Sequence, residues 1–327
     1  MKIKNQRDVL LRQPAKFDLE FFRQMLHCLV QNGGPAVSEY KELTDLINQA
    51  ADAVKRGELS ADELRKVWGG IGDALTSTKT MQGFVWMKPH GYAGDFEIID
   101  RIYQHWISPD PRLAKWDEYF HAQTAPCAVR NRKAYFHSWL RQWEDQNQSH
   151  KIRVLNIGCG PNRDVFEYLD NHQNSRAVFE CVDNEPKAIA YAKNVCRGFL
   201  DRIEFQQANA FRYQPSRPPN LIWSAGLFDY LNNRLATLLL RRLWRWLPPG
   251  GELVIGNFSP ANSTRTYMEF MGSWILHHRT ESDLVSLARL AGIPDNAIHI
   301  EHESEQVNLF LHAKRIANGN MIEKDRL

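Results

Sequence analysis

The sequence has no long apolar run and no recognisable export signal. Its most apolar stretch, residues 235–247, is interrupted by three arginines, whereas a membrane-spanning helix needs roughly 18 or more consecutive apolar residues. Residues 1–14 carry positive charge, but no apolar segment of signal-peptide length follows before polar residues resume. We therefore expect a cytoplasmic protein without a membrane span.

Paired cysteines and a charge excess are also missing. The five cysteines form no C-x-x-C pair and are odd in number, so they predict free thiols and neither a disulfide framework nor a metal site. The chain has 41 Lys and Arg residues against 38 Asp and Glu, a net charge of +3. This excess is too small to indicate a dedicated nucleic-acid binder, so no nucleic-acid partner is expected.

The first part of the chain has the apolar spacing of helices. With 327 residues and 43% hydrophobic content, the chain is long enough for one large domain or for a core with an added lobe. At Ser60 the sequence Ser-Ala-Asp-Glu predicts a helix start, with Glu63 completing a capping box. Helices are expected over residues 17–29, 37–54, from 60 onward, 95–106 and 126–143, and a polar linker over 144–150. We therefore predict an all-helical N-terminal cap or substrate domain over residues 1–150.

From residue 151 to 327 short apolar runs alternate with helical segments. Strands are expected over residues 152–157, 178–182, 203–205, 221–223 and 252–256, with helices that include 186–196 and 233–246. Such alternation predicts an α/β domain with a mostly parallel, Rossmann-like sheet covered by helices on both faces. Residues 297–302 and 307–312 are too close for a crossover helix, so they predict an antiparallel C-terminal hairpin.

The loop after the first predicted strand holds Gly158, Cys159 and Gly160. The two glycines permit a tight turn and close approach of a ligand to the main chain. Arg163 stands where a G-x-G-x-x-G pattern has its third glycine, which argues against a dinucleotide site. An ordinary strand-to-helix turn is the alternative for this loop.

The next two strand ends carry polar residues. Asp183, followed by Asn184, lies about 20 to 25 residues after the glycines, the place of a carboxylate that accepts from ribose hydroxyls; its alternative role is to cap the following helix. After the third strand, Asn209, Ala210 and Phe211 are candidates to receive an adenine ring, and a simple polar turn is the alternative.

The fourth strand is followed by small residues and then by aromatic ones. Ser224, Ala225 and Gly226 precede Phe228 and Tyr230. The order of the Gly-rich loop, acidic strand end, adenine loop, aromatic loop, a Pro-Pro-Gly-Gly turn at 248–251 and a final hairpin resembles the class I S-adenosylmethionine-dependent methyltransferases. The resemblance covers residues 151–314 and implies that fold, S-adenosylmethionine as cofactor, and these loops as its binding site.

A second resemblance lies in and around the helical part. Residues 88–103, KPHGYAGDFEIIDRIY, resemble a segment of bacterial extracellular-factor proteins that are associated with biosynthesis of 3-hydroxypalmitic acid methyl ester; residues 126–132 and 267–281 are similar as well. The resemblance implies methyl transfer to a small molecule. The acceptor is either a fatty-acid-like carboxylate or another oxygen or nitrogen nucleophile.

The type of acceptor decides which residues the chemistry needs. A carboxylate, with a pKa of about 4 to 5, is ionised at neutral pH and needs a clamp and no base. An amine or hydroxyl acceptor needs a base. The clamp candidates are Arg101, Arg130, Arg279 and His90, the base candidates are His90, Asp95 and Glu97, and the candidates to orient or line the acceptor are Tyr92, Tyr103, Tyr267, Trp86, Phe228, Tyr230 and Trp274. Asp95 has the alternative role of capping the helix that follows it.

Two other functions are compatible with the sequence. An RNA methyltransferase would use a basic aromatic surface such as residues 241–246, although snorkelling arginines on a sheet-packing helix fit that segment equally well. The fourth-strand loop lacks the Asn/Asp-Pro-Pro-aromatic tetrad of base-methylating enzymes. A sensor that binds S-adenosylmethionine or its product without turnover is the remaining alternative.

Overall fold

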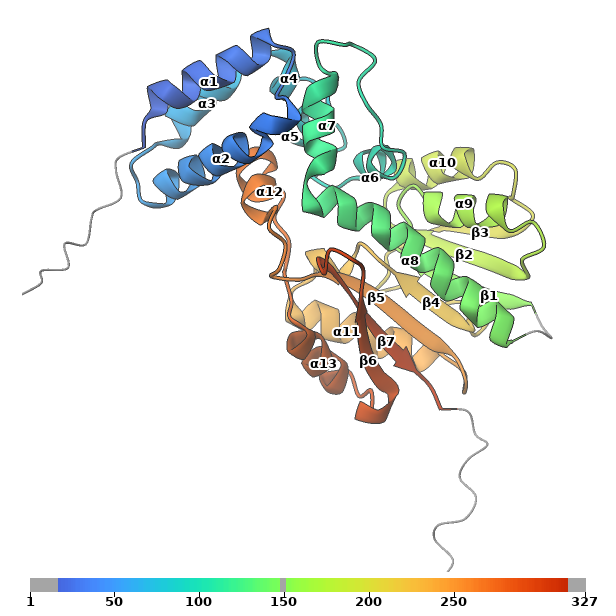
Figure 1. The fold of residues 1–327 in the computed structure, drawn as a ribbon. Helices are drawn as coiled ribbons and strands as arrows, with labels where there is room; N and C mark the ends of the chain where they lie inside the picture. The colour runs from blue at the N-terminus through green and yellow to red at the C-terminus, as the bar shows by residue number, and fades with distance from the viewer. Residues whose placement is uncertain (1–16, 148–150, 317–327) are drawn as a thin grey trace, which may run out of the picture.

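The computed structural model describes residues 17–147 and 151–316, and shows a helical part joined to an α/β part (Figure 1). The helical part is α1 (Leu19–Gln31), η1 (Val37–Glu39), α2 (Tyr40–Lys55), α3 (Ala61–Gly69), α4 (Asp73–Thr76), α5 (Met81–Met87), α6 (Phe96–Tyr103), α7 (Ala114–Ala122) and α8 (Thr124–Gln146). The α/β part is β1 (Ile152–Ile157), α9 (Arg163–Asn171), β2 (Ala177–Asp183), α10 (Pro186–Val195), β3 (Ile203–Gln207), β4 (Leu221–Ser224), η2 (Phe228–Tyr230), α11 (Asn233–Trp246), β5 (Glu252–Phe258), α12 (Arg265–Gly272), α13 (Glu281–Leu290), η3 (Asp295–Ala297), β6 (Ile298–His302) and β7 (Asn308–Lys314).

The sheet has seven strands in the order β3-β2-β1-β4-β5-β7-β6. Strands β1 to β5 pair in parallel, and β7 pairs antiparallel with both β5 and β6. The predicted fold class and C-terminal hairpin are confirmed. The strand order reverses between β1 and β4, so the crevice beyond their carboxyl ends is where a sheet of this kind binds ligands.

Alternation along the strands gives the sheet two buried faces. In β1, Val154 packs with α8, α9 and α10 residues, while Leu155 packs on the opposite face against α11 and α13. This period of two is expected for a strand that is covered on both faces. Helix α8 belongs to this packing: it runs from the helical part along the sheet (Figure 1), and its Phe136 and Leu140 are fully buried there.

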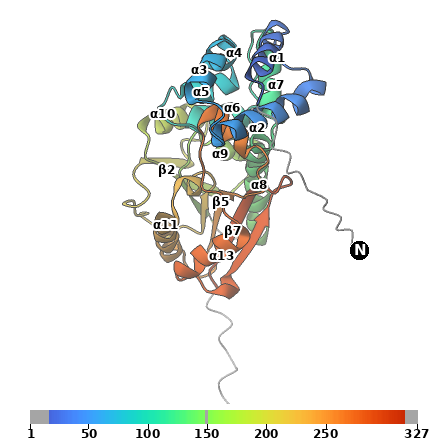
Figure 2. The same cartoon turned by 90° about the vertical axis from the view of Figure 1, so that its left-hand side faces the viewer.

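The helical part has its own apolar core, which a segment from the C-terminal half completes. Tyr267, Met268 and Met271 of α12 pack among residues of α1 to α7. Figures 1 and 2 show α12 beside α2, at the end of the sheet that the helical part occupies. The chain therefore returns to the helical part after β5, and this return fixes the helices relative to the sheet.

The polar segment predicted to be a linker begins within a helix. Helix α8 continues to Gln146, and the buried Glu144 accepts hydrogen bonds from the Ser175 hydroxyl at 2.8 Å, the Arg176 main-chain N–H at 2.8 Å and the Tyr168 hydroxyl. The linker prediction is wrong for residues 144–146, because contacts with residues distant in sequence hold them in the helix. Asn147 follows the end of the helix, and residues 148–150 lie outside the described part. Within residues 17–147 and 151–316, no helix combines the length and apolarity that crossing a membrane requires.

Replacing Asp117 by alanine should destabilise the helical part. The buried Asp117 carboxylate accepts hydrogen bonds from the main-chain N–H of Met81 at 2.6 Å and of Ser108 at 2.8 Å. Alanine leaves both buried donors without an acceptor, so we expect a loss of about 2–4 kcal/mol in the free energy of unfolding, measured by urea denaturation. Glu118→Ala, on the exposed side of the same helix, is the control and should change little.

The same variant should change the pH dependence of stability. Burial raises the pKa of Asp117 from 3.8 to about 6. Between those values the folded protein binds more protons at this carboxyl than the unfolded chain does, so the stability it contributes falls as the pH rises through that window. Asp117→Ala should remove this component of the slope, and an unchanged slope would contradict the assignment.

Candidate functional site

A cavity of about 430 Å³ lies beyond the carboxyl ends of the strands, where the sheet meets the helical part. Its walls come from the loops after β1, β2, β3, β4 and β5 and from the segments around α6 and α8. The cavity is therefore at the position that the strand order favours for a ligand. Of the predicted site residues, it is lined by Tyr92, Tyr103, Gly158, Cys159, Gly160, Asp183, Asn184, Asn209, Ala210, Phe211, Ala225, Gly226, Tyr230 and Trp274.

The Gly-rich loop and the acidic strand end are hydrogen-bonded to each other. Gly158 and Gly160 have φ of +69° and +53°, a conformation that favours glycine. The Gly160 N–H donates to Asp183 Oδ2 at 2.9 Å, and the Glu185 N–H donates to Asp183 Oδ1 at 3.0 Å. Burial raises the pKa of Asp183, and these main-chain donors oppose that effect. The carboxylate is thus oriented at the cavity wall by the loop itself.

The adenine-loop candidates form a polar turn that also lines the cavity. Asn209 Oδ1 accepts from the Phe211 N–H at 2.9 Å, which is the Asx-type turn that the sequence left as an alternative. Since Asn209, Ala210 and Phe211 all lie on the cavity wall, the turn and a binding role are compatible.

Only some of the site residues predicted after β4 lie at the cavity. Ala225, Gly226 and Tyr230 line the cavity, whereas Ser224 is fully buried and its hydroxyl donates to the Ile157 carbonyl at 2.8 Å. Phe228 is also fully buried, in the core between the sheet and α11. The structure gives these last two residues packing roles and does not bring them to the cavity.

The loop before α6 closes one side of the cavity. Tyr92 and Gly94 line it, and a Cβ at Gly94 would lie 2.2 Å from the Tyr230 hydroxyl and 2.5 Å from the Trp274 ring. Trp274 Nε1 donates to the Tyr230 hydroxyl at 2.9 Å, and that hydroxyl donates to the Ala93 carbonyl at 3.3 Å. Because Gly94 has no side chain, the loop can pack directly against Tyr230, which follows β4, and Trp274, which follows α12.

The catalytic candidates around this loop, apart from Tyr92, bind one another. Asp95 is buried and caps α6, accepting from the N–H groups of Glu97 and Ile98 at 2.9 and 3.0 Å. His90 Nε2 lies 3.0 Å from one Glu97 oxygen, and Arg101 donates to the other at 2.8 Å. None of His90, Asp95, Glu97 and Arg101 lines the cavity, because the helix start engages them locally.

The remaining predicted clamps and orienting residues are also engaged elsewhere. Arg130 lies 3.1 Å from His121 Nδ1 and donates to the His121 carbonyl at 3.0 Å. Arg279 donates to the Phe228 and Leu231 carbonyls and to Asn257 Oδ1. Tyr267 is buried in the helical core, and Trp86 packs at its edge. The structure does not bring these four residues to the cavity.

Arg132 is the cavity residue whose importance the sequence analysis missed. It is 5% exposed, and it is the one cationic residue among the described residues of the cavity wall. Its guanidinium donates to the Ala225 carbonyl at 3.0 Å and to the Tyr103 hydroxyl at 3.1 Å. The helical stripe of Val129, Arg132 and Phe136 was the available signal, because it places Arg132 on the buried face of α8 and Arg130 off it.

Two buried carboxyl groups on the cavity wall were also missed. Asp164 accepts from the indole N–H of Trp223 at 3.2 Å, and Asp229 accepts from the Phe258 N–H at 2.6 Å. Burial raises the pKa of both, that of Asp229 to about 6. No sequence pattern marked them, because their surroundings come from residues 59 and 29 positions away.

Comparison with known proteins identifies the domain. Residues 154–251 match a family model described as a methyltransferase domain. Trans-aconitate 2-methyltransferase from Methylobacterium nodulans (strain LMG 21967 / CNCM I-2342 / ORS 2060) is 31% identical over 103 residues, which are 32% of this chain and 37% of that protein. The match therefore spans little more than a third of this relative.

One solved structure is similar in fold to almost the whole chain. A possible exported protein from Bordetella parapertussis superposes with a TM-score of 0.58 at 17% identity, covering 93% of this chain and 98% of that one. Magnesium protoporphyrin IX methyltransferase from Synechocystis PCC 6803, with bound S-adenosylhomocysteine, has a TM-score of 0.46 at 14% identity, over 59% of this chain and 88% of that one.

The matched residues include the Gly-rich loop, Asp183, the adenine-loop candidates and the loop after β4. The resemblance to extracellular-factor proteins stays a prediction. Residues 154–251 are thus similar to a methyltransferase domain, and helices outside the matched residues help to enclose the cavity.

Proposed function

We propose that this protein transfers the methyl group of S-adenosylmethionine to a small carboxylate acceptor and forms a methyl ester. The observation that carries the proposal is a cavity that the Gly-rich loop and Asp183 share with aromatic residues of the helical part and of the segments after β4 and α12. A cytoplasmic location is part of the proposal, because all five cysteines are free thiols, as expected in a reducing compartment.

The strand order supports a direction for the bound cofactor. The adenine-loop candidates follow β3, Asp183 ends β2, and the Gly-rich loop and Gly226 follow β1 and β4, which are neighbours in the order β3-β2-β1-β4. A nucleoside with its base at Asn209 and its ribose at Asp183 would therefore extend its amino-acid end towards β1 and β4. Arg132 stands there, bonded to Ala225, and is suited to hold the carboxylate of that end.

The acceptor would then lie between this end and the helical part. Tyr92, Phe258, Tyr230, Trp274 and Leu276 line that side of the cavity. Aromatic rings attract a cationic sulfonium and exclude water. Burial and neighbouring carboxylates raise the pKa of Tyr92 well above its ordinary value, so its hydroxyl stays protonated and can donate to an acceptor oxygen.

The chemistry asks little more of the protein than alignment. The cofactor supplies a methyl group that its sulfonium already activates; a carboxylate oxygen forms the new C–O bond as the S–C bond breaks, and S-adenosylhomocysteine leaves. Holding two reactants in line can contribute about 7–11 kcal/mol. A carboxylate is ionised at neutral pH and needs no base. This agrees with the described lining of the cavity, which includes no histidine.

Two further observations bear on the acceptor. The name of the Methylobacterium relative contains aconitate, a carboxylate, which supports an acid as acceptor. The raised pKa of Asp229, about 6, favours a second candidate function in which a hydroxyl or amine is methylated with Asp229 as the base.

The test is incubation of the purified protein with methyl-labelled S-adenosylmethionine and a fractionated cell extract. A methyl ester releases its label as volatile methanol in mild alkali, whereas methyl ethers and methylamines keep it. We expect alkali-labile label in small acids. Alkali-stable label that also disappears with Asp229→Asn would support the second candidate; label in RNA, or cofactor binding without transfer, would overturn methylation of a small molecule.

Asp183→Ala should weaken binding of the cofactor product. The variant removes the expected acceptor for the ribose hydroxyls and the acceptor for the Gly160 N–H. Loss of hydrogen bonds to a charged group predicts a decrease of about 1–3 kcal/mol in the free energy of S-adenosylhomocysteine binding, measured by calorimetry. Asp170→Ala, an exposed carboxylate on α9, is the control; equal affinities in the two variants would refute the ribose contact.

A further inference from the structure

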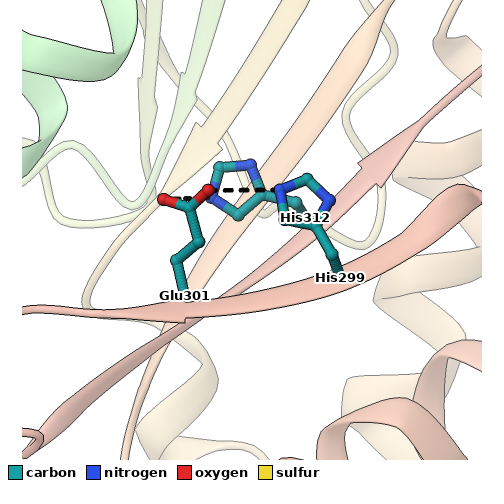
Figure 3. Close-up of side chains that lie close together, drawn as sticks. All are labelled: His299, Glu301 and His312. Carbon is teal, nitrogen blue, oxygen red and sulfur yellow. Dashed lines mark ion pairs between the residues drawn. The ribbon is translucent and has the colours of Figure 1, made fainter.

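The C-terminal hairpin brings two histidines and a glutamate together at the edge of the sheet (Figure 3). His299 of β6 is the cross-strand partner of His312 of β7, and Glu301, two residues further along β6, shares the face of His299. One ligand atom from each residue lies within 4.8 Å of the others. The cysteines of the sequence predict no metal site. The histidines and the glutamate do not mark one either, because only the pairing of β6 with β7 brings them together.

The distances suit a small divalent ion. His299 Nε2 lies 3.4 Å from Glu301 Oε1, and His312 Nε2 lies 4.0 Å from Glu301 Oε2. Ligands at about 2.0–2.2 Å from a tetrahedral zinc ion are about 3.4 Å apart. The side chains of His299 and Glu301 are each 51% exposed, so they can move the short remaining distance without disturbing the core.

The third ligand is buried and already oriented. His312 is 2% exposed, and its Nδ1 lies 2.7 Å from Glu252 Oε1, which also accepts from Trp139 Nε1 at 3.1 Å. A carboxylate at one ring nitrogen holds a proton there and leaves the lone pair of the other nitrogen free to bind a metal. Glu252 thus occupies the second-sphere position that metal-binding histidines commonly have.

The Tyr135 hydroxyl lies between Glu301 and His312. The Tyr135 hydroxyl of α8 lies 2.5 Å from Glu301 Oε2 and 2.5 Å from His312 Nε2. A phenolic hydroxyl has one proton, so Tyr135 can donate to only one of these two acceptors at a time.

We propose that His299, Glu301 and His312 bind a divalent transition-metal ion of the Zn²⁺ type, held in position by Glu252. Two imidazoles and a carboxylate are a typical three-ligand set for zinc, with one coordination position left open. None of these residues lines the cofactor cavity. The ion would link β6 and β7 and, through Tyr135, secure this edge of the sheet to α8.

The experiment uses the full chain with any affinity tag removed, titrated with Zn²⁺ alone by calorimetry, and with Co²⁺ to detect the visible absorption of a four-coordinate site. We expect one equivalent of Zn²⁺ to bind and to raise the melting temperature. His299→Ala and Glu301→Gln should each weaken binding by at least about tenfold. His302→Ala is the matched control, because His302 lies on β6 with the opposite orientation, and its affinity should equal that of the wild type.

Two results would overturn the proposal: no saturable binding of Zn²⁺ or Co²⁺, or binding that His302→Ala weakens as much as His299→Ala does. The first would leave these residues as a hydrogen-bonded cluster. Glu252→Gln tests the second sphere, and we expect a 10- to 100-fold weaker affinity with one equivalent still bound. The circular dichroism spectrum of each variant separates loss of the ligand from loss of the fold.

Discussion

Replacement of Asp100 by alanine is expected to lower the free energy of unfolding by about 3 kcal/mol, because it breaks a buried ion pair and leaves one partner behind. Asp100 of α6 is fully buried. Its two oxygens accept from Nε and Nη2 of Arg163, the second at 2.9 Å, and Oδ2 also accepts from the Tyr191 hydroxyl at 2.7 Å. One carboxylate therefore joins α6 of the helical part to α9 and α10 of the α/β part.

The loss should extend to cofactor binding. Arg163 is the first residue of α9 and follows the Gly-rich loop directly, while α6 follows the loop that closes the cavity. Without Asp100, both the loop and the cap lose a common anchor, and we expect weaker binding of S-adenosylhomocysteine as well as lower stability.

Urea denaturation and calorimetry measure the two effects. Asp170→Ala removes an exposed carboxylate further along α9 and serves as control. A double-mutant cycle with Arg163→Met isolates the pair: the second substitution should cost much less when Asp100 is already absent. Additive effects, or an Asp100 variant as stable as the control, would show that the pair does not couple the two parts.

Arg163 illustrates what the sequence could and could not predict. Its place at the third glycine of a G-x-G-x-x-G pattern is readable, and so is the exclusion of a dinucleotide site. Its partner is not readable, because Asp100 lies 63 residues away. The same reasoning explains why strand ends such as Gly158 and Asp183 lie together at the cavity: parallel strands bring their carboxyl ends to one edge whatever packs around them.

The positions of long side chains are harder to predict, since the burial of one helix face decides where they point. Arg101, Arg130 and Arg279 have the right chemistry for a clamp, yet each binds a carboxylate or main-chain carbonyls outside the cavity. Two positions beyond Arg130, Arg132 reaches the cavity because α8 turns that face to the sheet. Periodicity of burial discriminates between the two arginines, whereas residue type does not.

Arg132→Met should therefore distinguish binding of the amino-acid end of the cofactor from binding of its adenosine end. If its guanidinium holds the carboxylate of the amino-acid end, the loss of these charged hydrogen bonds should weaken S-adenosylhomocysteine binding by about 1.5–3 kcal/mol, or about 10- to 150-fold. Methylthioadenosine has the same adenosine and sulfur but no amino-acid end, so its affinity should change less than about threefold. Calorimetry with both ligands gives the comparison in one protein preparation.

The controls for this prediction come from the same helix. Arg130→Met removes a cation of equal size that lies outside the cavity, and it should leave both affinities unchanged. Arg132 also supports the Ala225 carbonyl and the Tyr103 hydroxyl, so a purely structural role would weaken both ligands alike, and that result would refute the carboxylate contact. Selective loss of affinity for S-adenosylhomocysteine would instead support a ligand whose sulfur lies beside Tyr92, Tyr230 and Trp274, because the cation would fix one end of the ligand and Asp183 the other. The methyl group of S-adenosylmethionine would then lie at the same place.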